Sequence, residues 1–144
     1  MTLKVVFDSS GSMSEKKSEI FNIFFLLRNI SAEYEINLQM YIWNENIIEF
    51  QEPKNLVYGK SLNTNALFNL VTSDEYKILI ITDGCFSLSI REEMKKFPNK
   101  NIFEYLLVGE DSNVQAVKKI TQKNVYRAED IMACINEIYM GVFQ

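Results

Sequence analysis

Short apolar runs rich in β-branched residues alternate along this chain with amphipathic stretches of helical length, and this alternation limits the fold more than any other feature. The runs expected as strands are residues 3–7, 36–43, 47–50, 76–82, 102–108 and 124–126. The stretches expected as helices are residues 14–30, 63–71, 89–97 and 129–139, together with a helix capped by Asp111 or Ser112. Strands that alternate with helices need crossover connections, which predicts a mostly parallel sheet with helices on both faces.

One connection refines this architecture. The segment Asn-Glu-Asn at 44–46 separates two strand-like runs and is short enough for a hairpin loop, which adds one antiparallel edge strand. With 144 residues the chain is long enough for one domain and too short for two ordinary ones. The predicted fold is a single α/β domain over 1–144, a Rossmann-like three-layer αβα sandwich. Its first helix is apolar on nearly every side, which predicts that the sheet and neighbouring elements cover most of it.

The composition excludes several kinds of function. The chain has no histidine, which removes Ser-His and Cys-His nucleophile pairs, histidine general bases and every zinc site that needs imidazole. The net charge of −4 argues against a general nucleic-acid surface or an anionic membrane as partner. Neither a signal-peptide pattern nor an apolar stretch of membrane-spanning length is visible, so we expect a cytoplasmic protein. Of the two cysteines, Cys134 is expected in the core and Cys85 in a loop, where its role stays open.

Oxygen-bearing side chains follow the strands expected at the centre of the sheet. In such sheets ligands bind beyond the carboxyl ends of the strands. Three loops supply candidates there: Asp8, Ser10 and Ser12 in FDSSGSM, Asp83 in ITDG, and Ser61 and Thr64 in YGKSLNTNAL. Gly11 allows the first loop to turn tightly enough for its alternate side chains to converge. Carboxylate and hydroxyl oxygens are hard ligands that suit Mg²⁺ or Mn²⁺ better than zinc, so these loops predict an octahedral oxygen site.

These motifs resemble a known metal site. FDSSGSM, IITDG and the serine-containing loop before an Ala-Leu helix start are similar to the metal-ion-dependent adhesion site (MIDAS) of the von Willebrand factor A (vWA) domain, written DxSxS…T…D. The resemblance covers essentially the whole chain in element order and implies the vWA fold, in the compact form of stand-alone bacterial members. It implies that Ser10 and Ser12 bind the metal directly, while Asp8 and Asp83 act mainly through water. The threonine position falls on Ser61 if the spacing to the following helix is kept, and Thr64 is the alternative.

A site of this kind predicts binding rather than catalysis. Its nearest protein ligands are neutral hydroxyls, so the cation stays under-neutralised and keeps an exchangeable water that an Asp or Glu of a partner can replace. The expected function is a metal-dependent protein-binding module, an adaptor or scaffold, that binds neither nucleic acid nor membrane. The resemblance adds a context, since stand-alone bacterial vWA domains often work beside an AAA+ ATPase or within another multi-component assembly. No general base is visible beside the motif, so we expect no enzyme.

Three other interpretations stay open at this stage. Ser12 followed by Glu15 has the spacing of a capping box, so the serines could serve only as a helix start. The chain could also be a structural vWA subunit with an inert metal site that docks through other surfaces. An aspartate-based phosphoryl-transfer domain is disfavoured, because Ser10 stands where a haloacid-type phosphatase needs a second aspartate and no lysine follows the late strand at 102–108.

Overall fold

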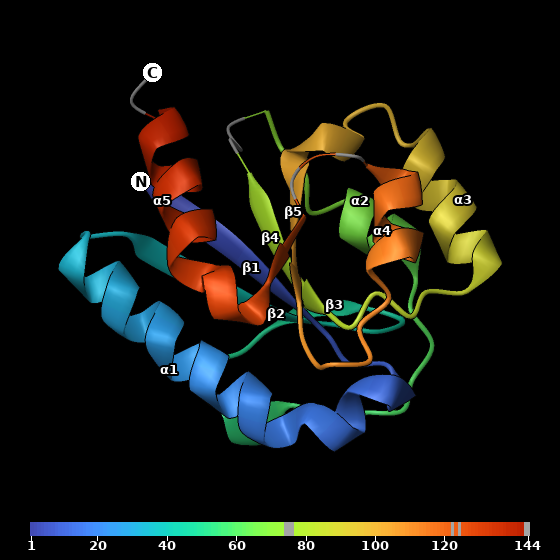
Figure 1. The fold of residues 1–144 in the computed structure, drawn as a ribbon, viewed down its shortest axis with the longest axis horizontal. Coiled ribbons are helices and arrows are strands. Elements are labelled where there is room, and N and C mark those ends of the chain that lie inside the picture. The colour runs from blue at the N-terminus through green and yellow to red at the C-terminus, as the bar shows by residue number, and fades with distance from the viewer. Residues whose placement is uncertain (74–76, 122, 124, 143–144) are drawn as a thin grey trace.

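A six-stranded sheet forms the centre of the computed structural model, which describes residues 1–73, 77–121, 123 and 125–142 (Figure 1). In spatial order its strands are β3 (Ile47–Glu49), β2 (Asn37–Trp43), β1 (Thr2–Asp8), β4 (Ile78–Thr82), β5 (Phe103–Leu107) and β6 (Val125–Arg127). Neighbouring strands run parallel except β2 and β3, which form the expected hairpin. The predicted α/β architecture with one antiparallel edge strand is therefore confirmed.

Helices cover both faces of this sheet (Figure 1). The α-helices are α1 (Lys17–Glu33), α2 (Thr64–Phe68), α3 (Leu88–Lys96), α4 (Val114–Ile120) and α5 (Ile131–Val142). Short 3-10 turns precede or link them: η1 (Gly11–Lys16), η2 (Pro53–Asn55), η3 (Lys100–Ile102) and η4 (Ala128–Asp130). Buried side chains of α1 and α5 pack on one face, whereas those of α2, α3 and α4 pack on the other.

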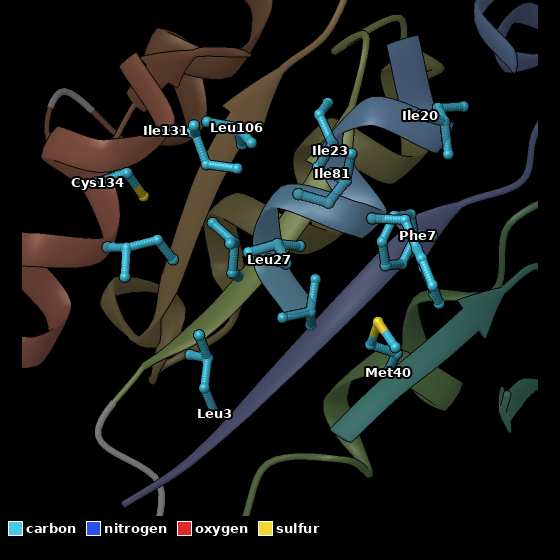
Figure 2. Close-up of a cluster of buried hydrophobic side chains, with 14 of the residues drawn as sticks. Leu3, Phe7, Ile20, Ile23, Leu27, Met40, Ile81, Leu106, Ile131 and Cys134 are labelled. Carbon is cyan, nitrogen blue, oxygen red and sulfur yellow. The ribbon is translucent and has the colours of Figure 1, made fainter. Parts of the chain in front are cut away.

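The central strands explain why the sequence folds into three layers. Every residue of β4 and of β5 is buried, which is typical of parallel strands covered on both faces. Successive side chains of a strand point to opposite faces, so Val5 joins the core under α1 and α5 while Val6 joins the core on the other side. Figure 2 shows the first of these cores, where Leu27 of α1 and Cys134 of α5 lie over the sheet.

Several predicted boundaries differ from the structure. The first helix does not begin as an α-helix at residue 14, because a 3-10 turn, Gly11–Lys16, precedes α1. The helix predicted at 63–71 ends at Phe68. Neither Asp111 nor Ser112 caps α4, since the Oδ1 atom of Asn113 accepts a hydrogen bond from the backbone N–H of Ala116 at 3.1 Å. Residues 76 and 124 of two predicted strands lie outside the described residues.

The first helix is less covered than its composition predicted. Phe21, Phe25 and Leu26 of α1 are 43%, 48% and 44% exposed, so the expectation that neighbours cover most of the helix is wrong. The physical reason is that one stripe of α1, including Ile20 and Phe24, faces the sheet, and no other helix or strand of the described residues covers its outer side (Figure 1). An amphipathic stripe is enough to dock a helix on a sheet.

Candidate metal site

The two predicted aspartates meet at the carboxyl end of the central strands. Asp8 is the last residue of β1 and Asp83 directly follows β4, the strand that pairs with β1 in parallel register, with Phe7 opposite Ile81. Both aspartates are almost fully buried, at 1% and 0% exposure. Burial of two carboxylates in one place is costly unless hydrogen bonds or cations compensate. The contacts of each carboxylate are therefore informative.

Asp8 fixes the shape of the first loop. Its Oδ1 atom accepts a hydrogen bond from the backbone N–H of Ser10 at 2.8 Å, and its Oδ2 atom accepts one from the hydroxyl of Thr82 at 2.7 Å. The Thr82 hydroxyl in turn accepts a hydrogen bond from the N–H of Gly84 at 3.0 Å. Burial raises the pKa of Asp8 above its usual range, while the hydrogen bonds from Thr82 and Ser10 oppose the rise. Asp8 thus connects the β1 loop to the β4 loop.

Asp83 leaves one oxygen without a partner. Its Oδ1 atom accepts a hydrogen bond from the N–H of Cys85 at 3.0 Å, whereas its Oδ2 atom is buried and has no hydrogen-bond partner among the described residues. The Nζ atom of Lys16 lies 3.8 Å from that oxygen. Buried polar atoms in native proteins are nearly always hydrogen-bonded, so this oxygen, whose one ionic contact is the more distant Lys16 ammonium, is a candidate ligand for a water or a cation.

The two motif serines, Ser10 and Ser12, lie in the loop after β1 with their side chains close together. Their Oγ atoms lie 3.4 Å apart, and Ser12 is exposed. The capping-box interpretation is wrong, because Ser12 lies inside the 3-10 turn and the residue that starts the turn, Ser10, makes no side-chain cap hydrogen bond. Other serines hold the loop instead. Ser9 Oγ donates to the carbonyl of Trp43 at 2.7 Å, and Ser14 Oγ donates to the carbonyl of Gly11 at 2.7 Å. The hydroxyls of Ser10 and Ser12 therefore remain available for a ligand.

The third loop contributes to the same cleft. Ser10, Ser61, Thr64 and Cys85 are among the residues that line an open cleft of about 540 Å³. Thr64 is buried and its hydroxyl donates to the carboxylate of Glu93. Ser61 is exposed, and its hydroxyl forms no hydrogen bond with the rest of the described chain. Ser61 therefore fits the threonine position of the motif better than Thr64, because the Thr64 hydroxyl is already hydrogen-bonded to Glu93.

A buried lysine, not singled out from the sequence, lies beside the aspartates. Lys16 is 5% exposed, and its Nζ atom lies 3.0 Å from Oδ1 of Asp111 and 3.4 Å from the carbonyl of Ser12. Burial acts to lower the pKa of Lys16, but the hydrogen bond and charge of Asp111, aided by Asp83, raise it overall. Gly109 makes room for this side chain. A Cβ atom at Gly109, whose φ is +95°, would lie 2.4 Å from Cε of Lys16.

The donor set fits a hard divalent cation that depends on hydroxyls and water. Among the described residues no three His, Cys, Asp or Glu side chains gather closely enough to hold a metal by themselves. The contacts link these groups in steps: Asp8 binds the N–H of Ser10, the hydroxyls of Ser10 and Ser12 lie 3.4 Å apart, and Ser10 lines the same cleft as Ser61 and Cys85, which donates its N–H to Asp83. Oxygen donors of this kind suit Mg²⁺ or Mn²⁺ and not zinc. The Oδ2 atom of Asp83 accepts no hydrogen bond from the described residues, so this oxygen fits a role as a ligand of such a cation.

Comparison with known proteins places the fold. No protein-family model matches the chain, and no curated protein sequence does. A solved structure of an aerotolerance-related membrane protein from Bacteroides fragilis, carrying multiple mutations to serines, matches with a TM-score of 0.61 at 16% identity, over 97% of this chain and 99% of that one. The conserved hypothetical protein BatB from Bacteroides thetaiotaomicron matches with a TM-score of 0.59 at 15% identity, over 97% and 99%. The chain shares their fold.

The likeness at this identity concerns the fold alone. The match is with the arrangement of sheet and helices over nearly the whole of each chain. None of the helices formed by the described residues combines the length and the apolar character needed to cross a membrane.

Proposed function

We propose that this chain is a vWA-type domain whose MIDAS-like site binds Mg²⁺ or Mn²⁺ and uses the cation to capture an acidic side chain of a partner protein. The observation that carries the proposal is the buried Oδ2 atom of Asp83, which accepts no hydrogen bond from the described residues and has only the Lys16 ammonium, 3.8 Å away, as an ionic contact. A helix start would not need such an oxygen. The sequence resemblance to the DxSxS…T…D motif supports the same residues.

The roles of the side chains follow from their contacts. Ser10 and Ser12 would hold the cation directly, with Ser61 from the third loop. Asp8 would not bind the cation directly, because both of its oxygens already accept hydrogen bonds from Ser10 and Thr82. Asp83 would contribute its free oxygen through water. When bound, the cation supplies a positive centre with one exchangeable coordination position, which a carboxylate of a partner can take.

Binding is preferred over catalysis because the nearest nucleophile is poorly activated. The exposed thiol of Cys85 has no histidine to activate it, because the chain contains none. Both oxygens of Asp8 accept hydrogen bonds, which holds this carboxylate in place as a structural group. The partner suggested by the vWA resemblance is an AAA+ ATPase or another component of a multi-component bacterial assembly, in the cytoplasm.

One observation favours a second candidate, a structural subunit with an inert metal site. The ammonium group of Lys16 lies 3.8 Å from Oδ2 of Asp83 and already supplies a positive charge there. A fixed internal cation could replace a metal for the purpose of folding. The two candidates differ in whether added metal changes what the protein binds.

Capture of partners from the native cell in Mg²⁺ and in chelator tests the proposal. The informative variant is Ser12→Ala, because the Ser12 side chain is exposed and its loss leaves the loop intact. Ser14→Ala is the matched control, since Ser14 lies in the same turn but donates to the Gly11 carbonyl. We expect partners in Mg²⁺ for the wild type and for Ser14→Ala, and their loss in chelator or with Ser12→Ala. The same partners in all four conditions would support the inert subunit.

A further inference from the structure

A cleft between α3 and α4 concentrates positive charge on a protein that is acidic overall. The cleft measures about 810 Å³, and its lining includes Arg91, Lys95, Lys100, Lys118, Lys119 and Lys123. Glu92 is the one carboxylate among the described residues that line it. The whole chain has 15 Lys and Arg residues and a net charge of −4, so six of its cations meet in this one place. We call this the basic cleft.

Helix dipoles account for only part of this concentration. Lys95 lies in the last turn of α3, and Lys118 and Lys119 lie in the last turn of α4, where a lysine stabilises the carboxyl end of the helix. Arg91 belongs to the first half of α3, however, and Lys100 and Lys123 lie outside both helices. Three of the six cations therefore have no explanation in the helices themselves.

The six cations form no ion pair within the part of the chain that the structure describes. None of them forms a salt bridge with a carboxylate of the described residues, and the Nε atom of Arg91 is buried without a hydrogen-bond acceptor. Like charges that line a common cleft repel one another and raise the local potential. An anion that enters the cleft relieves this repulsion.

We propose that the basic cleft binds an acidic segment of a partner protein, one that carries several Asp or Glu residues beside an apolar side chain. The apolar part of the segment would contact Leu88, which lines the cleft and is 65% exposed. Nucleic acid fits less well, because no described residue of the lining is aromatic and could stack on a base. The net negative charge of the rest of the molecule would also repel a long phosphate backbone.

This surface is separate from the candidate metal site. The two clefts share no lining residue, since Ser89, Ile90 and Glu93 of α3 border the metal-site cleft whereas Arg91 and Lys95 border the basic cleft. Binding in the basic cleft therefore needs no metal. This distinguishes it experimentally from the proposed adhesion site, and either proposal can fail without the other.

Fluorescence anisotropy with a labelled peptide rich in glutamate and leucine tests the proposal in the presence of chelator. A peptide with glutamine in place of each glutamate is the ligand control. Lys95→Glu and Lys118→Glu reverse charges inside the basic cleft. Lys96→Glu is the matched control, because Lys96 is exposed in the same last turn of α3 but does not line the cleft. Thermal melting shows whether each variant is folded.

We expect the glutamate peptide to bind and the glutamine peptide not to. Lys95→Glu and Lys118→Glu should each weaken binding by about tenfold, and Lys96→Glu by less than about twofold. Raising NaCl from about 0.05 M to about 0.3 M should weaken wild-type binding severalfold, because salt screens the charges. No salt-dependent binding of the glutamate peptide, or equal effects of Lys95→Glu and Lys96→Glu, would overturn the proposal. Tighter binding of a single-stranded oligonucleotide would overturn it in favour of nucleic acid.

Discussion

Gly109→Ala should destabilise the protein more than the same change at Gly59, and the difference measures how tightly Lys16 is held. Both glycines have positive φ, +95° and +109°, which costs an L-residue about 1–2 kcal/mol. A Cβ atom at Gly59 would meet nothing within 4 Å, so backbone strain is the whole expected cost there. At Gly109 the new atom would lie 2.4 Å from Cε of Lys16 and 2.8 Å from Oδ1 of Asp111.

The extra cost at Gly109 comes from displacing the lysine. Its side chain is flexible and can move, but the movement breaks its contact with Asp111 and removes a cation from beside Asp83. The Asp111 side chain is 70% exposed, so water screens that pair and its loss contributes little. The buried, unpaired carboxylate oxygen of Asp83 adds about 1 kcal/mol or more. We therefore expect a loss of about 2–4 kcal/mol for Gly109→Ala against about 1–2 kcal/mol for Gly59→Ala.

Urea denaturation measures both losses, and a double-mutant cycle isolates the lysine. In a Lys16→Ala background the cost of Gly109→Ala should fall toward that of Gly59→Ala, because only the exposed Asp111 side chain, 2.8 Å from the new Cβ atom, then has to move. Equal losses for the two glycine variants in the wild-type background would refute the reasoning. So would an unchanged cost of Gly109→Ala after Lys16 is removed.

Three further predictions concern single side chains. Burial raises the pKa of Glu104 to about 7, so the folded state binds this proton more tightly than the unfolded state and loses stability as pH rises from about 5 to about 8. Relative to Glu104→Gln, the free energy of unfolding of the wild type should fall by about 1–3 kcal/mol over that pH range. If denaturation gives parallel curves of stability against pH for the two proteins, the prediction is wrong. Lys16→Met removes a positive charge beside the candidate site, so calorimetry should show about tenfold tighter Mg²⁺ binding, and unchanged affinity would count against the site. Asn113→Ala should lower the free energy of unfolding by about 1 kcal/mol, because it removes the cap of α4. Ser112→Ala should lower it less, since the buried Ser112 hydroxyl has no hydrogen-bond partner among the described residues. The reverse order would contradict the assignment of Asn113 as the cap.

The strands and the carboxylates of the candidate site followed from local sequence. An uninterrupted apolar run such as that of β4 fits only a strand covered on both faces, and topology then brings the residues after β1 and β4 to one edge. Asp8 and Asp83 could therefore be placed together before any coordinates were known. The metal itself stays a prediction, because hydroxyl geometry shows what can bind and not what does.

The features that the sequence did not predict depend on contacts between distant segments. The burial of Lys16 requires Asp111, 95 residues further along the chain, and the space left by Gly109. Asp111 lies in the loop after β5, and α4 begins two residues later with Asn113 as its cap. The Ser12–Glu15 spacing matched a capping box, but the chain forms a 3-10 turn over Gly11–Lys16, and Asp8 accepts a hydrogen bond from the N–H of Ser10 just before it. A pattern of neighbouring residues does not predict such contacts between distant segments.

Titration of the ¹⁵N-labelled protein with Mn²⁺ tests the central claim most directly, because the paramagnetic ion broadens the amide signals of residues around its binding site. We predict that the signals of Ser10, Ser12 and Cys85 broaden first and that excess Mg²⁺ restores them. The natural alternative is the acidic cleft of about 680 Å³ lined by Glu15, Glu19, Glu110 and Glu129, among others. Broadening at that cleft with the signals of Ser10 and Ser12 intact, or no selective broadening at all, would contradict a metal-dependent adhesion site in this protein.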